Sequence, residues 1–379
     1  MKRFYVIDAL RSVLALWVAI GHAGVFPLFG AEGQNDWLLD LIARGVRSLV
    51  WGPPAVIVFF VISGFCIHYP FAASGKRCQT LRFYARRYLR ILIPVAFTVA
   101  MFKLMFPQTV IVGADSILWH STLWSIVCEE AFYALYPFLN RLSFSFGLAA
   151  ILRPTIAAAL LVAWLSYPAE EWQDLGILGT AVVLFPVWLL GCGLAERVSS
   201  IKQVCSQRAI WGWRLSAWAV MWMAEMLHFH GGIPQTRTSL WTGIFFYFWV
   251  RAEIGYYRGR APWAVLVWAG RWSYSLYLVH PLVIALCFKH GFLIESSPAN
   301  FVAMMVLILT GAYVFYLLVE RPSHNCARRI ALFAPDEPRY AGAAEQTAGA
   351  IFQSMEETGA WAHMNLHRFD PGQGPRTSD

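Results

Sequence analysis

Long runs of apolar residues alternate with short polar connections along most of the chain. A helix needs about 20 such residues to cross a bilayer. Runs of about this length lie near 6–29, 50–70, 89–106, 123–140, 147–165, 177–195, 209–226, 240–250, 263–288 and 300–319. The eighth run is short, and Arg153-Pro154 stands near the start of the fifth. The pattern predicts an all-α fold, a polytopic transmembrane helix bundle of about ten spans.

The composition agrees with a location in the membrane. Apolar residues make up 58% of the 379 residues, whereas charged residues make up only 14%. A soluble domain carries about 25% charged residues, because its surface needs them. The composition therefore excludes disordered, fibrous and disulfide-scaffold proteins and argues against a soluble enzyme.

The net charge of +8 indicates orientation rather than binding of nucleic acid. If Met1 lies in the cytoplasm, the basic residues concentrate in the inside connections, and the acidic loop with Glu170, Glu171 and Asp174 falls outside. This is the positive-inside pattern, so we expect both termini in the cytoplasm. None of the seven cysteines falls in an outside loop, so no disulfide is expected.

The composition changes after Glu320-Arg321-Pro322. Residues 335–379 are rich in Gly, Ala, Pro, Glu and Gln and contain no apolar run long enough to span. Such segments cannot bury enough apolar surface to fold. We therefore expect one transmembrane domain over 1–322, followed by a largely disordered cytoplasmic tail over 323–379.

Three ionisable residues interrupt the first apolar run. An ionisable group near the middle of a membrane helix is costly and normally faces the bundle interior. Arg11 and His22 are eleven residues apart, so they share a helix face and are separated by about 16 Å along the axis. Asp8 lies one turn from Arg11 and can pair with it. The alternative is an arginine at the cytoplasmic boundary and a structural histidine near the interface.

Two adjacent acids, Glu129 and Glu130, stand within the fourth run. Neighbours on a helix point about 100° apart, so the two carboxylates cannot face the same way. We expect at least one of them to reach the polar interior, where it would orient His22, hold an arginine or act as an acid. The other fits a charge pair that fixes helix packing.

Small and polar residues mark two further runs. Ser63-Gly64 in the second run permits a close backbone approach or a local break. In the ninth run, Ser273, Tyr277 and His280 follow i, i+4, i+7 spacing and form a polar stripe. A hydrogen-bonded structural stripe and a catalytic one remain open alternatives.

A cationic and aromatic segment, 82–91, lies at the predicted cytoplasmic edge between the second and third spans. Its basic residues include Arg86, Arg87 and Arg90. Such a segment binds either lipid head groups or a phosphorylated cytosolic ligand, because guanidinium matches phosphate oxygens in a bidentate way. Arg87 and Arg90 are one turn apart and can clamp one phosphate group.

These features together resemble the acyltransferase 3 family of integral-membrane O-acyltransferases. The resemblance covers about residues 4–322 and rests on five motifs in the expected order: Arg11-x10-His22, Phe59–Phe65, Arg87–Arg90, Trp124–Tyr133 and Ser273–Pro281. The chain departs slightly, with Ala9 where the family usually has Gly and Ala131 where Gln is common. It resembles the stand-alone type, without an appended hydrolase-like domain, so a later transfer step would need a partner protein.

The resemblance implies transfer of an acyl group, usually acetyl, from cytosolic acyl-CoA to a hydroxyl of an envelope glycan or related acceptor, in a bacterial plasma (inner) membrane. On this reading Arg86, Arg87 and Arg90 dock the CoA, and His22 removes the hydroxyl proton, because histidine titrates near neutral pH. Glu129 or Glu130 fixes the tautomer of His22.

The remaining roles stay open at this point. Arg11 or a backbone N–H near Ser63-Gly64 stabilises the oxyanion. Transfer is either direct or passes through a covalent acyl-enzyme on Ser63, Tyr277 or His22, with Asp8 and His280 completing the candidate site. No metal is expected, although His228 and His230 near Glu225 form a weak candidate.

Two other functions have the same general features. A transporter or flippase for a glycan or a lipid-linked intermediate also has about ten spans and a basic inner face, but it more often has two similar halves. A membrane glycosyltransferase would favour acidic metal ligands at a membrane face, and Glu129-Glu130 do not provide them.

Overall fold

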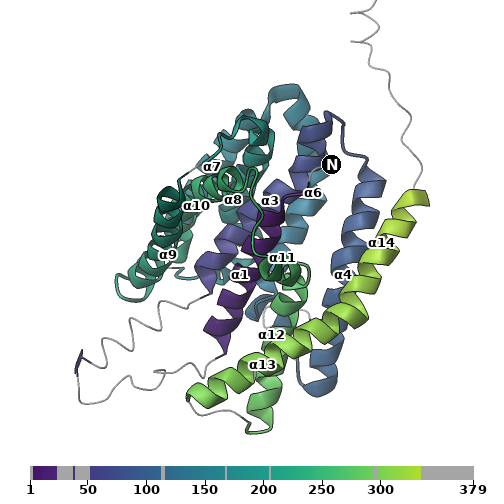
Figure 1. Cartoon of the computed structure of the whole chain (residues 1–379), viewed down its shortest axis with the longest axis vertical. Helices are drawn as coiled ribbons and strands as arrows, with labels where there is room; N and C mark the ends of the chain where they lie inside the picture. Colours follow the sequence, from purple (N-terminus) through teal and green to yellow (C-terminus); the bar gives the residue numbers. More distant parts are fainter. Residues whose placement is uncertain are drawn as a thin grey trace, which may run out of the picture. The chain divides into compact units, whose positions relative to one another are not determined.

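The computed structural model describes residues 3–23, 37–38, 52–111, 116–166, 169–204, 206–292 and 297–333. The part of the first predicted span beyond Ala23, the start of the second before Gly52, and the part of the predicted tail from residue 334 onward lie outside these residues. Every regular element that the structure describes is helical, which confirms the all-α prediction (Figure 1).

The longer helices correspond to the predicted apolar runs. They are α1 (Tyr5–His22), α3 (Pro53–Ser74), α4 (Thr80–Met105), α6 (Trp124–Phe146), α7 (Leu148–Leu165), α8 (Gly176–Glu196), α9 (Gln207–Phe229), α10 (Gln235–Tyr256), α12 (Ser273–Lys289) and α13 (Pro298–Phe315). The shorter elements are α5 (Ile117–His120), η1 (Gln173–Leu175), η2 (Val198–Ser200), α11 (Ala264–Ala269), η3 (Tyr316–Glu320) and α14 (Arg321–Phe333).

Six of the described helical segments are long and apolar enough to cross a membrane: α1, α3, α4, α7, η1 with α8, and α13 through α14. Helices α6, α9 and α10 have sufficient length, with 23, 23 and 22 residues, but they are more polar. Large apolar side chains face outward, for example Leu178, which is 83% exposed. Lipid is the environment that such a surface requires. The count of about ten spans and the cytoplasmic position of the termini stay predictions.

Helices α3 and α8 form the centre of the bundle, and they touch backbone to backbone. A Cβ atom added to Gly64 would lie 1.9 Å from the carbonyl oxygen of Trp188, and one added to Gly191 would lie 2.0 Å from that of Val61. Any side chain at these two positions would force the helices apart. The close approach expected at Ser63-Gly64 is therefore confirmed, and α3 continues through it without a break.

The ninth predicted span is divided in two. Helix α11 ends at Ala269, and α12 begins at Ser273. A Cβ atom on Gly270 would lie 2.0 Å from the backbone oxygen of Asp8, so α1 presses directly against this junction. Only glycine permits that approach, and the break fixes where α12 starts.

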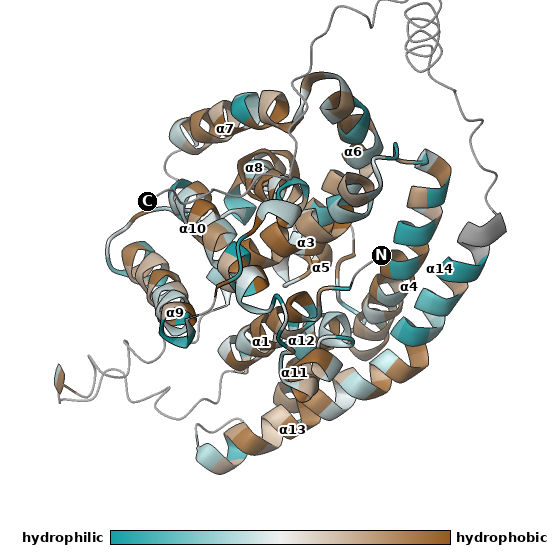
Figure 2. Ribbon diagram, turned by 45° about the horizontal axis from the view of Figure 1, so that its top comes forward, coloured by the Kyte–Doolittle hydropathy of each residue, from teal (hydrophilic) through white to brown (hydrophobic). Residues whose placement is uncertain are grey.

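The C-terminal end of the bundle extends beyond the expected boundary at 322. After α13, the π-helical turn η3 leads directly into α14, which runs to Phe333 beside α4 (Figures 1 and 2). Residues 323–333 are therefore helical rather than part of the tail. Ser323 donates its hydroxyl hydrogen to the carbonyl of Leu89 at 2.5 Å, which ties α14 to α4. Ser323 and Ala327 are the buried residues among the α14 side chains that the structure describes.

Candidate functional site

Three arginines from two helices form a cationic cluster, hereafter the arginine cluster. Arg11 comes from α1, and Arg87 and Arg90 come from α4, and all three side chains are half-buried. They lie close enough to interact electrostatically with one another. None of the three forms an ion pair or a hydrogen bond with another described residue, and the Nε atom of Arg87 is buried without a partner. The cluster therefore has donors and charge to offer to an anion.

Arg86 lies apart from this cluster. Its side chain is exposed, because residues 86 and 87 point about 100° apart on α4. The structure therefore brings together two of the three arginines predicted at this edge, and it adds Arg11, which the sequence placed among the catalytic residues.

A chain of hydrogen bonds runs beneath Arg87. The guanidinium of Arg87 stacks over the ring of Tyr133 at 4.7 Å. The hydroxyl of Tyr133 donates to the carboxylate of Glu129, and the Oγ of Ser63 lies 2.9 Å from the same hydroxyl. Because the hydrogen of Tyr133 goes to Glu129, Ser63 is the donor to Tyr133. Trp188 donates its indole N–H to Ser63 at 3.1 Å.

This chain determines what Ser63 and Glu129 can do. The hydroxyl of Ser63 has its hydrogen directed to Tyr133 and a lone pair occupied by Trp188, and it forms no hydrogen bond with a histidine among the described residues. The backbone amides near Ser63 and Gly64 belong to an unbroken helix, so they already donate within α3. Glu129 reaches the polar interior, as expected for one of the two acids.

Glu130 has a different environment from Glu129. Both of its carboxylate oxygens are buried, and neither has a hydrogen-bond partner among the described residues. Arg87 and Glu129 are its nearest electrostatic neighbours. Glu130 therefore faces the arginine cluster rather than His22.

The two predicted histidines meet at the other end of α1. The ring centroids of His22 and His280 lie 5.2 Å apart, and the planes are tilted by 50°. His22 is exposed and lies against Gly52 at the start of α3, whereas His280 is completely buried. The rings come from α1 and α12, so their pairing depends on how these two helices pack.

Backbone carbonyls select the tautomer of both rings. The Nδ1 atom of His22 lies 2.8 Å from the oxygen of Val18, and that of His280 lies 3.0 Å from the oxygen of Leu276. A carbonyl only accepts, so Nδ1 carries the hydrogen, and Nε2 of the neutral ring keeps a lone pair. The Nε2 of His280 has no partner among the described residues. The carbonyl of Val18 therefore fixes the tautomer of His22, a role that we expected for Glu129 or Glu130.

Tyr277 joins the histidine pair to α6. Its hydroxyl donates to the carbonyl of Thr122 at 2.9 Å and lies 2.7 Å from the Oγ of Ser125. Its ring lies 5.9 Å from that of His280. Ser273, the first residue of the predicted stripe, donates to the carbonyl of Gly270. The stripe is hydrogen-bonded along its length, and His280 at its end is the member with a free ring nitrogen.

The predicted pairing of Asp8 with Arg11 is wrong. Asp8 instead forms an ion pair with Arg3, whose terminal nitrogen lies 2.8 Å from its Oδ2 and whose Nε donates to the same oxygen at 2.9 Å. Asp8 lies in the first turn of α1, where the helix dipole favours an acid, and Arg3 precedes that turn. With Asp8 paired to Arg3, Arg11 forms no ion pair with a described residue.

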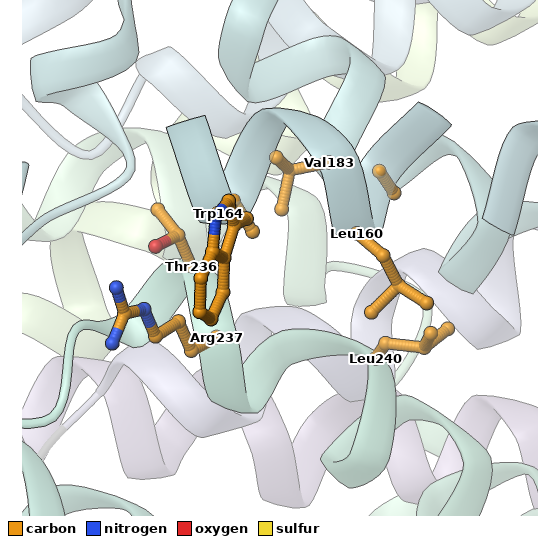
Figure 3. Close-up of a pocket in the computed structure, with 8 residues that line it drawn as sticks. Leu160, Trp164, Val183, Thr236, Arg237 and Leu240 are labelled. Carbon is orange, nitrogen blue, oxygen red and sulfur yellow. The ribbon is translucent and has the colours of Figure 1, made fainter. Parts of the chain in front are cut away.

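The described part of the chain contains no group of three or more His, Cys, Asp or Glu residues that could hold a metal ion. At the weak candidate on α9, a ring nitrogen of His228 lies 3.3 Å from the carbonyl of Ile233, and His230 is exposed. A cavity of about 150 Å³ between α7, α8 and α10 contains none of the predicted site residues (Figure 3). Arg237 covers the ring of Trp164 at its rim.

Comparison with known families decides the identity of the fold. Residues 4–317 match the model of an acyltransferase domain, acyltransferase 3. The chain belongs to the acyltransferase 3 family. No curated protein and no solved structure matches it. The match covers the bundle from α1 to the π-helical turn, so the chain is an integral-membrane acyltransferase.

The structure adds residues that the motifs of the acyltransferase 3 family did not bring to notice. Trp188 supports Ser63, and Glu320 accepts hydrogen bonds from Ser275 at the start of α12. Glu320 is an acid at the end of an apolar run, which was a signal in the sequence. Trp188 gave no signal, because tryptophans are abundant throughout this chain.

Proposed function

We propose that this acyltransferase moves an acyl group, acetyl in the first instance, from cytosolic acyl-CoA to a hydroxyl of an envelope glycan or related acceptor, in a bacterial plasma membrane. The observation that carries the proposal is the arginine cluster. Glu130 and Glu320 lie within electrostatic range of the cluster, but no described residue accepts a hydrogen bond from its guanidiniums, so their donors are open to a bound anion. A ligand with several phosphates, such as CoA, is the anion that three converging guanidiniums suit.

The distance between the two ends of the site supports this donor. Arg11 and His22 are separated by about 16 Å along α1. A donor whose phosphates sit at the cluster therefore needs a long arm to bring its reactive carbon to the histidines. The pantetheine arm of acyl-CoA is such an arm, with the thioester at its tip. The acceptor would then approach the exposed His22 from the outer end of α1.

The chemistry follows from the tautomer of His22. Its Nε2 lone pair takes the proton of the acceptor hydroxyl while that oxygen attacks the thioester carbonyl. The new C–O bond forms, the C–S bond breaks, and the sulfur of CoA leaves as a thiolate. The proton on Nε2 then passes to this sulfur and gives free CoA, so His22 returns to its starting state. His280 contributes a second ring nitrogen beside this path.

Direct transfer fits the contacts better than an acyl-enzyme. Ser63 is held by Tyr133 and Trp188, and the hydrogen of Tyr277 goes to Thr122. Neither hydroxyl has a base beside it that would activate it as a nucleophile. His22 remains as the base, which needs no covalent intermediate.

The test is mass spectrometry of envelope glycans from cells that express the wild-type chain, His22→Ala or the control His230→Ala. We expect an acyl mass increment with the wild-type chain and with the control, because His230 is exposed and remote from the predicted motifs. His22→Ala should lose the increment at equal protein level. Retention of the increment in His22→Ala would refute the proposed base, and its absence with the wild-type chain would refute acylation of glycans.

A further inference from the structure

The first turn of α12 takes its N-terminal cap from a different helix. Its own N-cap residue, Trp272, makes no side-chain cap hydrogen bond. The Oε2 atom of Glu320 instead accepts the backbone N–H of Ser275 at 3.1 Å and the hydroxyl of Ser275 at 2.5 Å. The first amides of a helix lack partners within the helix, and a carboxylate there is favoured by the helix dipole.

The π-helical turn η3 places this carboxylate. Glu320 is the last residue of η3, and its side chain is only 1% exposed. A π-helical turn inserts one residue and rotates those that follow, and such turns are frequent at functional sites. Ser323 then fixes the next turn to α4 through the carbonyl of Leu89. The backbone is therefore fixed on both sides of Glu320, by η3 before it and by the contact of Ser323 with α4 after it, and its carboxylate lies at the start of α12.

The other carboxylate oxygen of Glu320 lies close to α14. Its Oε1 is 3.6 Å from the Nε2 of His324, one helical turn further along the chain. Glu320 also lies within electrostatic range of Arg90 and Arg11, without forming an ion pair with either. The carboxylate therefore links the first turn of α12 to the C-terminal end of the bundle.

We infer that Glu320 is a positioning residue for the histidine end of the site. Its Oε2 atom holds the first turn of α12 and so sets the position of Tyr277 and His280 on that helix. The effect on acyl transfer rests on the proposed function, whereas the cap does not.

The cap is tested by hydrogen–deuterium exchange on the full chain in lipid nanodiscs. In Glu320→Ala the amides of the first turn of α12 should exchange faster than in the wild-type chain. In Glu320→Gln they should remain protected, because the amide oxygen still accepts from Ser275. The control is Glu225→Ala, which removes another buried acid, on α9, whose Oε2 atom has no hydrogen-bond partner among the described residues, and which should leave exchange in α12 unchanged.

Unchanged exchange of that turn in Glu320→Ala would overturn the cap. If this variant does not accumulate, Ser275→Ala gives the answer, because it removes one of the two hydrogen bonds and should accelerate exchange in the first turn alone. Equal exchange in Ser275→Ala and the wild-type chain would then contradict the inference.

The positioning role is tested by acyl transfer in cells at equal protein level. Glu320→Ala should transfer less than the wild-type chain, and Glu320→Gln should transfer at close to the wild-type rate, because its amide oxygen restores the cap. Wild-type transfer by Glu320→Ala, or equal loss in both variants, would overturn this role. If the wild-type chain transfers no acyl group, the proposed function fails, and the exchange experiment still decides the cap.

Discussion

Two half-buried arginine sites in this chain differ in how their charge is balanced. On α9 and α10, Arg214 forms a two-point ion pair with Glu253, at 2.8 and 3.0 Å, and donates to Tyr257 at 3.2 Å. Glu253 is buried and also accepts from Trp249. Arg11, Arg87 and Arg90 have no such partners. The first site is complete within the protein, whereas the second has donors that no described residue accepts.

This contrast separates a structural arginine from a binding one. A guanidinium whose hydrogen bonds are satisfied by the chain holds two helices together, so removing it should lower the free energy of unfolding. A guanidinium that the fold leaves unsatisfied destabilises the fold, so removing it should lower the affinity for a ligand instead. The two sites can therefore be broken independently.

The largest effect is expected at the complete site. Glu253→Ala leaves the guanidinium of Arg214 half-buried without its counter-ion, which costs about 3–5 kcal/mol of stability. Thermal unfolding in nanodiscs should show this as a large drop in Tm, while the remaining folded protein binds CoA as before. If the variant were as stable as the wild-type chain, the ion pair would contribute nothing to stability, and the account of this site would be wrong.

The next effect is expected at the arginine cluster. Arg87→Ala combined with Arg90→Ala removes two charged donors from the phosphate site. CoA affinity should fall at least about 100-fold, since hydrogen bonds to charged groups contribute about 1.5–3 kcal/mol each and about 1.4 kcal/mol is tenfold in affinity. Tm should change little. Calorimetric titration of CoA measures the first, and Arg208→Ala, an exposed arginine on α9, is the matched control. Equal affinity in the double variant would refute the dock.

The sequence predicted most of the residues at the arginine cluster, but it did not predict which charged residues form ion pairs with one another. The spacing of Arg11 and His22 predicted a shared face, and the motifs placed Arg87 and Arg90 at the same edge. The sequence equally allowed Asp8 to neutralise Arg11, because i, i+3 neighbours on a helix can meet. Only the packing shows that Arg3 takes Asp8, and this leaves Arg11 available to a ligand.

The two histidines likewise show which features the sequence predicts and which only the packing determines. The sequence singled out His22 and His280 separately, on runs far apart in the chain, and acidic neighbours suggested a carboxylate partner for His22. The structure brings the two rings together and assigns their Nδ1 hydrogens to Val18 and Leu276. Backbone carbonyls leave no pattern in a sequence, so this choice of tautomer was not predictable.

A smaller effect should distinguish geometry from charge at the cluster. Arg87→Lys keeps the positive charge but loses the planar fork that binds two phosphate oxygens, and it weakens the stacking over Tyr133. We expect CoA affinity to fall about fivefold to tenfold, between the wild-type chain and the double variant. An affinity as low as that of the double variant would show that charge alone does not account for binding.

The smallest effect is expected from salt. Raising the ionic strength from about 0.01 M to about 0.15 M shortens the screening length from about 30 Å to about 8 Å. CoA binding should weaken by about threefold, whereas the Tm set by the Arg214–Glu253 pair should barely move, because its atoms are in direct contact. Titrations and melting curves at both salt concentrations give the two numbers. Salt-independent binding would argue against recognition of the phosphates.

The most direct test of the account is to follow the acyl group itself. Inside-out membrane vesicles that contain the wild-type chain are supplied with acetyl-CoA labelled in the acetyl carbon, and label is measured in the membrane acceptors together with free CoA. The account predicts equal amounts of transferred label and released CoA, and neither in His22→Ala. Transfer of label by His22→Ala at the wild-type rate, or no transfer by the wild-type chain despite tight binding of acetyl-CoA, would contradict it.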